Sequence, residues 1–225
     1  MRLVCISDTH GDHNQVVLPA GDVLVHTGDI TAHGTQADLD DFLSWFAAQP
    51  HRHRLFVAGN HDTFLEMSPE DARRRAEAAG VVWLNDSGIV IDGIAFWGSP
   101  ITLRFLDWNF MRDAGEDIDR HWRLIPDDTD VLLTHGPPHG ILDAVKRENG
   151  TSEKTGCPSL LTRVLDIKPR LHLFGHIHEE RGDVTQDGIR FLNVSTMDRF
   201  YRIAHEPVVV DLPATGAAQV HDFER

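Results

Sequence analysis

Short apolar runs rich in Val, Ile, Leu and Phe recur along the chain, and each ends at glycine, proline or polar residues. Runs of this length and composition predict β-strands. We expect strands at 2–7, 23–27, 54–58, 81–84, 88–91, 94–98, 130–134, 171–174, 189–194 and 207–212. The Asn-Asp and Asp-Gly turns between the strands of 81–98 predict antiparallel pairing there, and hence a mixed sheet.

Several segments between these strands carry helical periodicity instead. After Thr35, a predicted N-cap, apolar residues follow the i, i+3, i+4 spacing of a helix that packs on a sheet: Leu39, Phe42, Leu43, Phe46 and Ala47. Ser68 and Pro69 open a second helix that ends at Gly80. We expect further helices at 117–124 and 158–165. The pattern predicts an α/β fold, and the absence of a linker predicts one domain over residues 1–225.

The segment 99–116 has no clear period and is long for a connection. Its aromatic side chains either seal a small satellite core beneath a loop or form a wall for a substrate base or ring. The second interpretation makes Arg104 and Trp108 candidate substrate contacts.

Composition narrows the classes of function. A hydrophobic fraction of 41% with 25% charged residues is typical of a globular domain. The formal net charge of -14 repels polyanions over most of the surface, so extended nucleic acid is not an expected partner. A small phosphorylated substrate stays compatible with this charge, because bound divalent cations reverse the local sign.

The cellular setting is predicted from what the chain lacks. Cys5 and Cys157 form no CxxC motif, and no disulfide is expected. The first apolar run is too short for a signal peptide, and no run approaches the ~20 apolar residues of a membrane span. These features predict a cytoplasmic protein without a membrane partner.

Five of the predicted strands end in residues that bind metals: Asp8 and His10, Asp29, Asn60, His135, and His176 and His178. Ligands of open α/β sheets bind at the carboxyl ends of strands, so these side chains are expected to converge. Carboxylate, imidazole and amide oxygen are the ligands of two-metal hydrolytic sites, which share one carboxylate. Each motif alone is more often a solvated turn than a ligand set, and the indication comes from all five together.

In chain order, these blocks resemble the motif set of calcineurin-like metallophosphoesterases: Asp8-Thr9-His10, Gly28-Asp29, Gly59-Asn60-His61-Asp62, Thr134-His135 and Gly175-His176-Ile177-His178. Longer stretches, such as Thr134-His135-Gly136-Pro137-Pro138, resemble the branch known as metallophosphoesterase-domain-containing proteins. The resemblance implies a four-layer α/β/β/α sandwich of two mixed sheets flanked by helices. It also implies a metal-dependent phosphodiesterase whose substrates include nucleotides, cyclic ones among them.

The resemblance assigns residue roles as well. Asp29 would bridge two metal ions, and a hydroxide between the ions would attack phosphorus. His61 would contact the phosphate with Asn60 and His135, and would stabilise or protonate the leaving oxygen, while Asp62 would brace the loop. The first ion would be held by Asp8, His10, Asp29 and His178, and the second by Asp29, Asn60, His135 and His176.

Other interpretations stay open at this point. The same site suits a phosphomonoesterase acting on a small metabolite, or a protein that binds nucleotides with its metals but does not turn them over. The histidine and oxygen ligands predicted for this site can bind manganese, iron, zinc or cobalt. His26 lies inside a strand and matches no ligand position, so it is expected to be a packed or hydrogen-bonded histidine. His13, His51, His53 and His139 also lack the strand-end context and are assigned surface or core roles.

Overall fold

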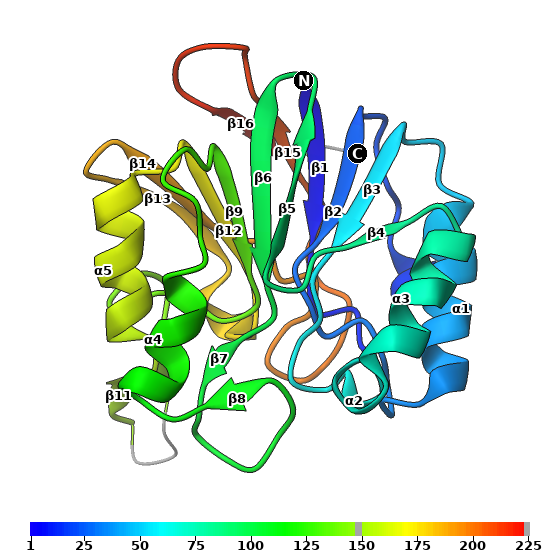
Figure 1. Ribbon diagram of the computed structural model, residues 1–225, viewed down its shortest axis with the longest axis horizontal. Coiled ribbons are helices and arrows are strands. Elements are labelled where there is room, and N and C mark those ends of the chain that lie inside the picture. Colours follow the sequence, from blue (N-terminus) through cyan, green and yellow to red (C-terminus); the bar gives the residue numbers. More distant parts are fainter. Residues whose placement is uncertain (147–149, 223–225) are drawn as a thin grey trace.

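The computed structural model describes residues 1–146 and 150–222, in which two six-stranded sheets pack face to face (Figure 1). The first sheet has the order β16 (Gln219–Asp222), β15 (Val208–Asp211), β1 (Arg2–Ile6), β2 (Val23–His26), β3 (His53–Phe56), β4 (Val82–Trp83). The second has the order β13 (Gly182–Gln186), β14 (Ile189–Asn193), β12 (Leu171–Phe174), β9 (Val131–Thr134), β6 (Ile94–Ser99), β5 (Ser87–Ile91).

Both sheets are mixed, as predicted. In the first, β1 to β4 are parallel, and β15 and β16 add an antiparallel edge. In the second, β6, β9, β12 and β14 are parallel, and β5 and β13 are antiparallel edges. The predicted antiparallel pairing holds for β5 with β6. It is wrong for β4, which pairs parallel to β3 in the other sheet because α3 (Pro69–Ala78) makes the crossover between them.

Helices cover the outer faces of both sheets (Figure 1). Helices α1 (Gln36–Ala47) and α3 lie on the side of the first sheet, and α4 (Glu116–Trp122) and α5 (Pro158–Ile167) lie on the side of the second. The short α2 (Thr63–Met67) precedes α3, and η1 (His13–Gln15) and η2 (His178–Glu180) are single 3-10 turns. The α/β/β/α order of layers is therefore confirmed.

Strand periodicity divides the core into two parts. Leu3 and Cys5 of β1 belong to the cluster between the sheets, whereas Val4 belongs to the cluster beneath the helices. Successive side chains of a strand point to opposite faces, so a strand covered on both sides is apolar throughout. This explains why the central strands read as continuous apolar runs rather than alternating ones.

The predicted N-cap residues Thr35 and Ser68 do precede helices, but only Thr35 makes a capping hydrogen bond. Thr35 caps α1 through a capping box with Asp38, whose backbone N–H donates to the Thr35 hydroxyl oxygen over 3.2 Å. Ser68 precedes α3 as predicted, yet its side chain makes no capping bond, because the preceding helix α2 ends at the same residue. Among the described residues, no helix is long and apolar enough to cross a membrane.

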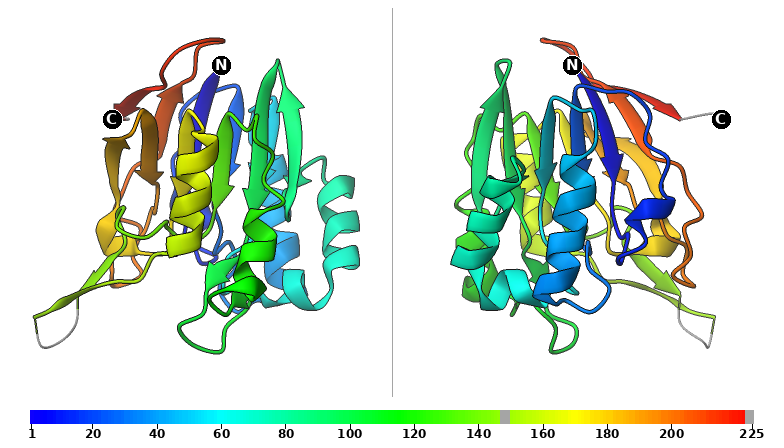
Figure 2. Two further views of the ribbon diagram at one scale, coloured as in Figure 1. Left: turned by 60° about the vertical axis from the view of Figure 1, so that its left-hand side comes forward. Right: turned by 90° about the vertical axis from the view of Figure 1, so that its right-hand side faces the viewer.

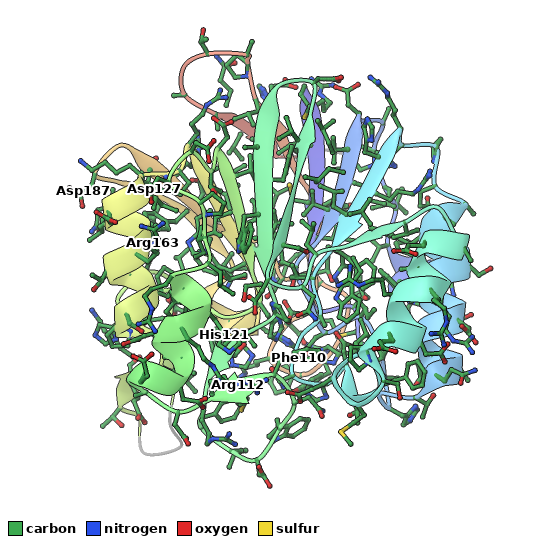
Figure 3. The ribbon with its side chains drawn as sticks, in the orientation of Figure 1. Phe110, Arg112, His121, Asp127, Arg163 and Asp187 are labelled. Atoms are coloured by element: carbon green, nitrogen blue, oxygen red, sulfur yellow. The ribbon has the colours of Figure 1, made fainter. Side chains whose placement is uncertain are left out.

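The segment 99–116 contains two short parallel strands, β7 (Thr102–Leu103) and β8 (Met111–Arg112), below the sheets in Figure 1. Glu66 of α2 holds the segment: it accepts bonds from the backbone N–H of Phe110 (2.8 Å) and from the Arg112 guanidinium (3.0 Å), two residues labelled in Figure 3. Phe110 is buried, as the satellite-core interpretation expects, but it belongs to the large cluster beneath the helices and not to a separate small core. A hairpin of β10 (Ala144–Lys146) and β11 (Ser152–Lys154) projects at the same end (Figure 2).

Candidate metal centre

The parallel strands of both sheets end on one side of the molecule, the lower side in Figure 1. There the two sheets are joined by an isolated parallel bridge between Ser7, after β1, and Ser195, after β14. All seven predicted ligand residues follow strands that end here, since Asp8 and His10 follow β1, Asp29 follows β2, Asn60 follows β3, His135 follows β9, and His176 and His178 follow β12.

One group of potential ligands consists of Asp8, His10 and His178, whose ligand atoms lie within 4.8 Å of one another. The His178 Nε2 is 3.5 Å from Asp8 Oδ1 and 3.4 Å from His10 Nε2. A second group, Asp29, His135 and His176, satisfies the same limit. The structure thus places the ligands predicted for each ion together.

Asp29 lies between the two groups. Its Oδ2 is 3.3 Å from His135 Nε2 and 3.6 Å from His10 Nε2. Asn60 joins the second group, since its Oδ1 is 3.0 Å from His135 Nε2. His61, predicted as a phosphate contact, also lies within ligand distance of Asp29 and His10.

Several of these residues leave their strands in the left-handed backbone region, where side chains other than glycine are rare. Asp8 has φ 54°, His10 42°, Asp29 55° and His176 69°. This conformation bends the chain sharply at the strand end and turns the side chains toward the other sheet. Backbone strain of this kind concentrates at functional sites.

Of the glycines at 28, 59 and 175, which lie at three of these strand ends, only Gly28, with φ 110°, has a backbone conformation that favours glycine. Gly59 and Gly175 instead leave space for a neighbouring carboxylate. A Cβ on Gly175 would overlap Asp8 Oδ2, and a Cβ on Gly59 would overlap Asp29 Oδ1. Both carboxylates therefore pass directly over a glycine of a neighbouring strand end.

Backbone carbonyls and hydroxyls fix the orientation of the potential ligands. The Thr27 carbonyl lies 3.0 Å from His135 Nδ1, and the Asp198 carbonyl lies 3.1 Å from His178 Nδ1. Accepting an Nδ1–H in this way leaves Nε2 free to face the carboxylates, which is how metal-binding imidazoles are held. Asp8 Oδ2 accepts a 2.6 Å bond from the Ser195 hydroxyl.

His26 is a packed, hydrogen-bonded histidine, as predicted. Its Nδ1 accepts from the backbone N–H of Gly28 (3.3 Å), and its Nε2 lies 2.9 Å from the Thr9 hydroxyl. The ring thereby connects the two loops that carry Asp8 and Asp29. Burial lowers the pKa of His26 to about 3, so the ring stays neutral.

The ionisation of the centre suits cation binding. Burial opposes charge on Asp29, but the positive potential of His135 and His10 outweighs it and holds the pKa of Asp29 well below its usual range. Burial alone would lower the pKa of His135 and of His178. The charge of Asp29 instead raises the pKa of His135 to about 9, and the charge of Asp8 raises the pKa of His178 to about 9. Burial, aided by His135, lowers the pKa of His176 to about 3.

This donor set fits divalent metal ions. Buried carboxylates need neutralising charge, and here protonated imidazoles supply it. A coordinated imidazole must be neutral, so a bound dication would displace these protons and take over their role. Two carboxylates, four imidazoles and one amide oxygen are the ligand types that such ions share.

Asp62 is buried as a brace for the surrounding loops, in line with its predicted role. Its carboxylate accepts bonds from the backbone N–H groups of Ile30, Thr31 and Gly59, at 2.7 to 3.2 Å, and from the Thr31 hydroxyl at 2.7 Å. Burial and the nearby charge of Asp29 raise the pKa of Asp62 to about 7.

A cavity of about 410 Å³ opens beside the centre. Trp108 lines it, with its ring centroid 4.3 Å from that of His61. Arg104, the other candidate contact in the segment 99–116, does not line it, because its guanidinium instead bonds Asp113 (2.8 Å) and Asp107 (3.3 Å).

Sequence reasoning missed Tyr201, whose ring packs edge-on against the rings of both His10 and His178, at centroid distances of 4.9 and 5.0 Å. It lies on the connection between β14 and β15, where no local pattern marks it. The one signal was its rarity, since it is the single tyrosine of the chain.

Comparisons with known proteins agree with this geometry. A sequence model described as calcineurin-like phosphoesterase matches residues 1–180. The chain is 32% identical over 234 residues to the human metallophosphoesterase domain-containing protein 1, covering 94% of this chain and 71% of that protein. The solved structure of the phosphopantetheinyl hydrolase of Mycobacterium tuberculosis is similar with a TM-score of 0.64 at 15% identity, over 88% of this chain and 90% of that one.

A structure described as a novel archaeal phosphodiesterase is similar with a TM-score of 0.51 at 12% identity, over 99% of this chain and 100% of that one. At such identities these structural similarities concern the fold alone. The family match and the human relative go further: the chain belongs to the calcineurin-like phosphoesterases, a family of metal-dependent phosphoester hydrolases.

Proposed function

We propose that the protein hydrolyses phosphodiesters with two divalent metal ions. Asp8, His10, Asp29 and His178 would hold one ion, and Asp29, Asn60, His135 and His176 the other. The observation that supports this best is the position of Asp29, whose Oδ2 lies within 3.6 Å of an imidazole from each group. A carboxylate in this position can act as a ligand that bridges two metal ions.

When bound, the ions supply positive charge to the phosphoryl oxygens and increase the acidity of the attacking water. The protein's own residues do the remaining work. His61 is held in place by its backbone N–H, which donates to Asp29 Oδ1 over 2.8 Å, and by the ring of Trp108. Its ring thus stays close to the centre without being needed as a ligand.

The protonation of His61 defines its part in the reaction. Burial lowers the pKa of His61, so its ring is neutral near pH 7 and offers one N–H. That N–H donates to a phosphoryl oxygen in the bound substrate. The phosphate anion raises the pKa of the ring, so the ring takes up a second proton from solvent, and this proton passes to the leaving oxygen as its bond to phosphorus breaks.

The test uses purified protein supplied with Mn²⁺, bis-p-nitrophenyl phosphate as substrate, and metal analysis of each variant. Asp29→Asn should lose both ions and at least 100-fold in kcat, because removing one charge weakens both sites. His61→Gln should keep both ions and lose about 100-fold or more in kcat, the usual size of a general-acid effect. His139→Gln is the matched control, since His139 is 43% exposed and does not line the cavity.

Other outcomes would reassign the function. Unchanged turnover in Asp29→Asn would overturn the two-metal assignment. A several-fold preference for p-nitrophenyl phosphate over the diester would make the protein a phosphomonoesterase. Tight nucleotide binding in calorimetry without product over hours would make it a binding protein.

A further inference from the structure

The cavity beside the metal centre has two chemically different regions. Its inner wall is apolar and buried, and is formed by Ile101, Trp122, Cys157, Leu160 and Ile177, which are at most 5% exposed. These residues come from the segment 99–116, from α4, from α5 and the residue before it, and from the loop after β12. The same cavity is lined by Asp29, Asn60, His176 and His178, so the apolar wall and the residues that would hold the metal ions share one space.

The rim of the cavity is apolar as well. Phe105, Leu106, Trp108 and Tyr201 line it while remaining 41 to 56% exposed. These four make up nearly half of the nine large hydrophobic side chains exposed in the described part of the chain. Scattered exposed hydrophobic residues need no explanation, but a group around one opening marks a binding site.

Polar side-chain groups in the cavity are few away from the metal centre, and one of them, the buried Nε1–H of Trp122, makes no hydrogen bond within the described part of the chain. The hydroxyl of Thr102 donates to the Pro100 carbonyl, and that of Thr155 donates to the Asp143 carbonyl. Glu153 and Glu179 line the cavity only where the surface is exposed. The edge of a nucleobase carries several donors and acceptors, and leaving most of them unpaired on the inner wall would weaken binding.

The charge of the lining argues against a second phosphate group. Among the described residues, none that lines the cavity is Lys or Arg, the side chains that normally recognise phosphate. The two glutamates add negative charge. A substrate with a further phosphate would bring a second anion to a lining in which the described residues offer it no Lys or Arg partner.

From these observations we propose that the cavity binds the organic group of the phosphoester, and that this group is an uncharged alkyl or aryl group. The inference rests on the proposed function for the position of the phosphate at the metal centre. It adds the substrate class: an ester with one phosphate and an apolar substituent, in preference to a nucleotide or a polyphosphate.

Calorimetry with phosphonates tests this without turnover. Inorganic phosphate, methylphosphonate, butylphosphonate, hexylphosphonate and phenylphosphonate are titrated into the Mn²⁺-loaded protein, together with adenosine 5′-monophosphate. Affinity should rise by up to about fourfold for each methylene that enters the cavity, since burying one is worth about 0.8 kcal/mol. Phenylphosphonate should bind more tightly than adenosine 5′-monophosphate.

Two pairs of variants locate the effect. Val145→Phe narrows the cavity and should weaken hexylphosphonate binding at least tenfold while leaving methylphosphonate binding unchanged. Val90→Phe, at an exposed position of β5 away from the cavity, should change neither affinity. Leu106→Ser should weaken phenylphosphonate binding several-fold. Leu124→Ser is its matched control, since Leu124 is 53% exposed against 56% for Leu106 and does not line the cavity.

The two proposals fail in different ways. Equal affinity for inorganic phosphate and all phosphonates, or tighter binding of adenosine 5′-monophosphate than of phenylphosphonate, would overturn the substrate class even if diester turnover is intact. Binding that increases with chain length and depends on Val145, without hydrolysis of any diester, would support the cavity and overturn the proposed function alone.

Discussion

Single residues in this protein are constrained most where two strand ends meet. Asp8 occupies a left-handed backbone conformation, and its carboxylate rests above Gly175. The resulting position allows it to accept bonds from the Ser195 hydroxyl and the backbone N–H of His176. The sequence motifs placed Asp8 and His176 in one two-metal site, as ligands of different ions, but they could not indicate that the glycine beside His176 is required for space.

Gly175→Ala should therefore act through Asp8 and through the adjacent Ser7, since the added Cβ would overlap Asp8 Oδ2 and Ser7 Oγ equally. The new methyl group would displace the carboxylate or the end of β12, so we expect a lower metal content, at least a tenfold lower kcat, and a loss of about 1–3 kcal/mol in the free energy of unfolding. Metal analysis and urea unfolding measure these changes. In the control Gly182→Ala the added Cβ meets only the tip of Leu142 at 3.1 Å, and unaltered metal content in both variants would contradict the steric explanation.

At the scale of elements, the sequence predicted correctly those helices and strands whose formation depends on neighbouring residues alone. The helix α1 was predicted from a capping residue and an apolar stripe, and its four buried residues Leu39, Phe42, Leu43 and Phe46 are members of that stripe. The strands that end in ligands were found for the same reason, because each is apolar and stops at polar residues. Strand β4 was assigned the wrong partner, since pairing across sheets depends on the crossover rather than on the turn beside it.

The apolar pattern of the sequence did not predict strands that contain few apolar residues. Strand β11 is exposed along its whole length, and β13 alternates between exposed and partly buried residues, so neither produces an apolar run. The pairs β7 with β8 and β10 with β11 are too short to carry a period. The cavity they border could not be predicted because its walls come from distant parts of the chain.

The capping box of α1 gives a prediction at this scale. Thr35→Ala removes the acceptor for the Asp38 N–H and should lower the free energy of unfolding by about 1 kcal/mol, measured in urea. Thr162→Ala is the control, because Thr162 lies inside α5 and its hydroxyl only returns to the Pro158 carbonyl. That change should be neutral or slightly stabilising, since alanine favours a helix interior. Equal losses in both variants would rule out a capping effect.

For the whole molecule, buried neutral histidines link stability to pH. Burial lowers the pKa of His172 to about 3, whereas an unfolded histidine titrates near 6.5. Between these values the unfolded chain binds a proton that the folded chain does not. The stabilising contribution is therefore complete above pH 6.5 and falls by about 1.4 kcal/mol per pH unit on acidification.

His172→Phe should remove this contribution. The aromatic ring replaces the imidazole beside Phe174 and Phe191, and the Thr134 hydroxyl keeps its 2.7 Å bond to the Gly136 carbonyl. Urea unfolding of both proteins at several pH values from 6.5 to 4.5 should show a shallower decline for the variant, by about 1.4 kcal/mol per pH unit. Parallel declines would mean that His172 does not titrate differently in the folded state.

The bond between Ser195 and Asp8 also has a consequence during protein synthesis. These residues are 187 positions apart, and β1 pairs with a strand, β15, whose Asp211 lies opposite Arg2. A ribosome releases Asp8 early, yet its partners emerge only after most of the chain has been translated. Contacts of such long range form late in folding. Cation uptake should consequently begin only when both sheets are nearly complete, so that the appearance of bound metal marks the end of folding.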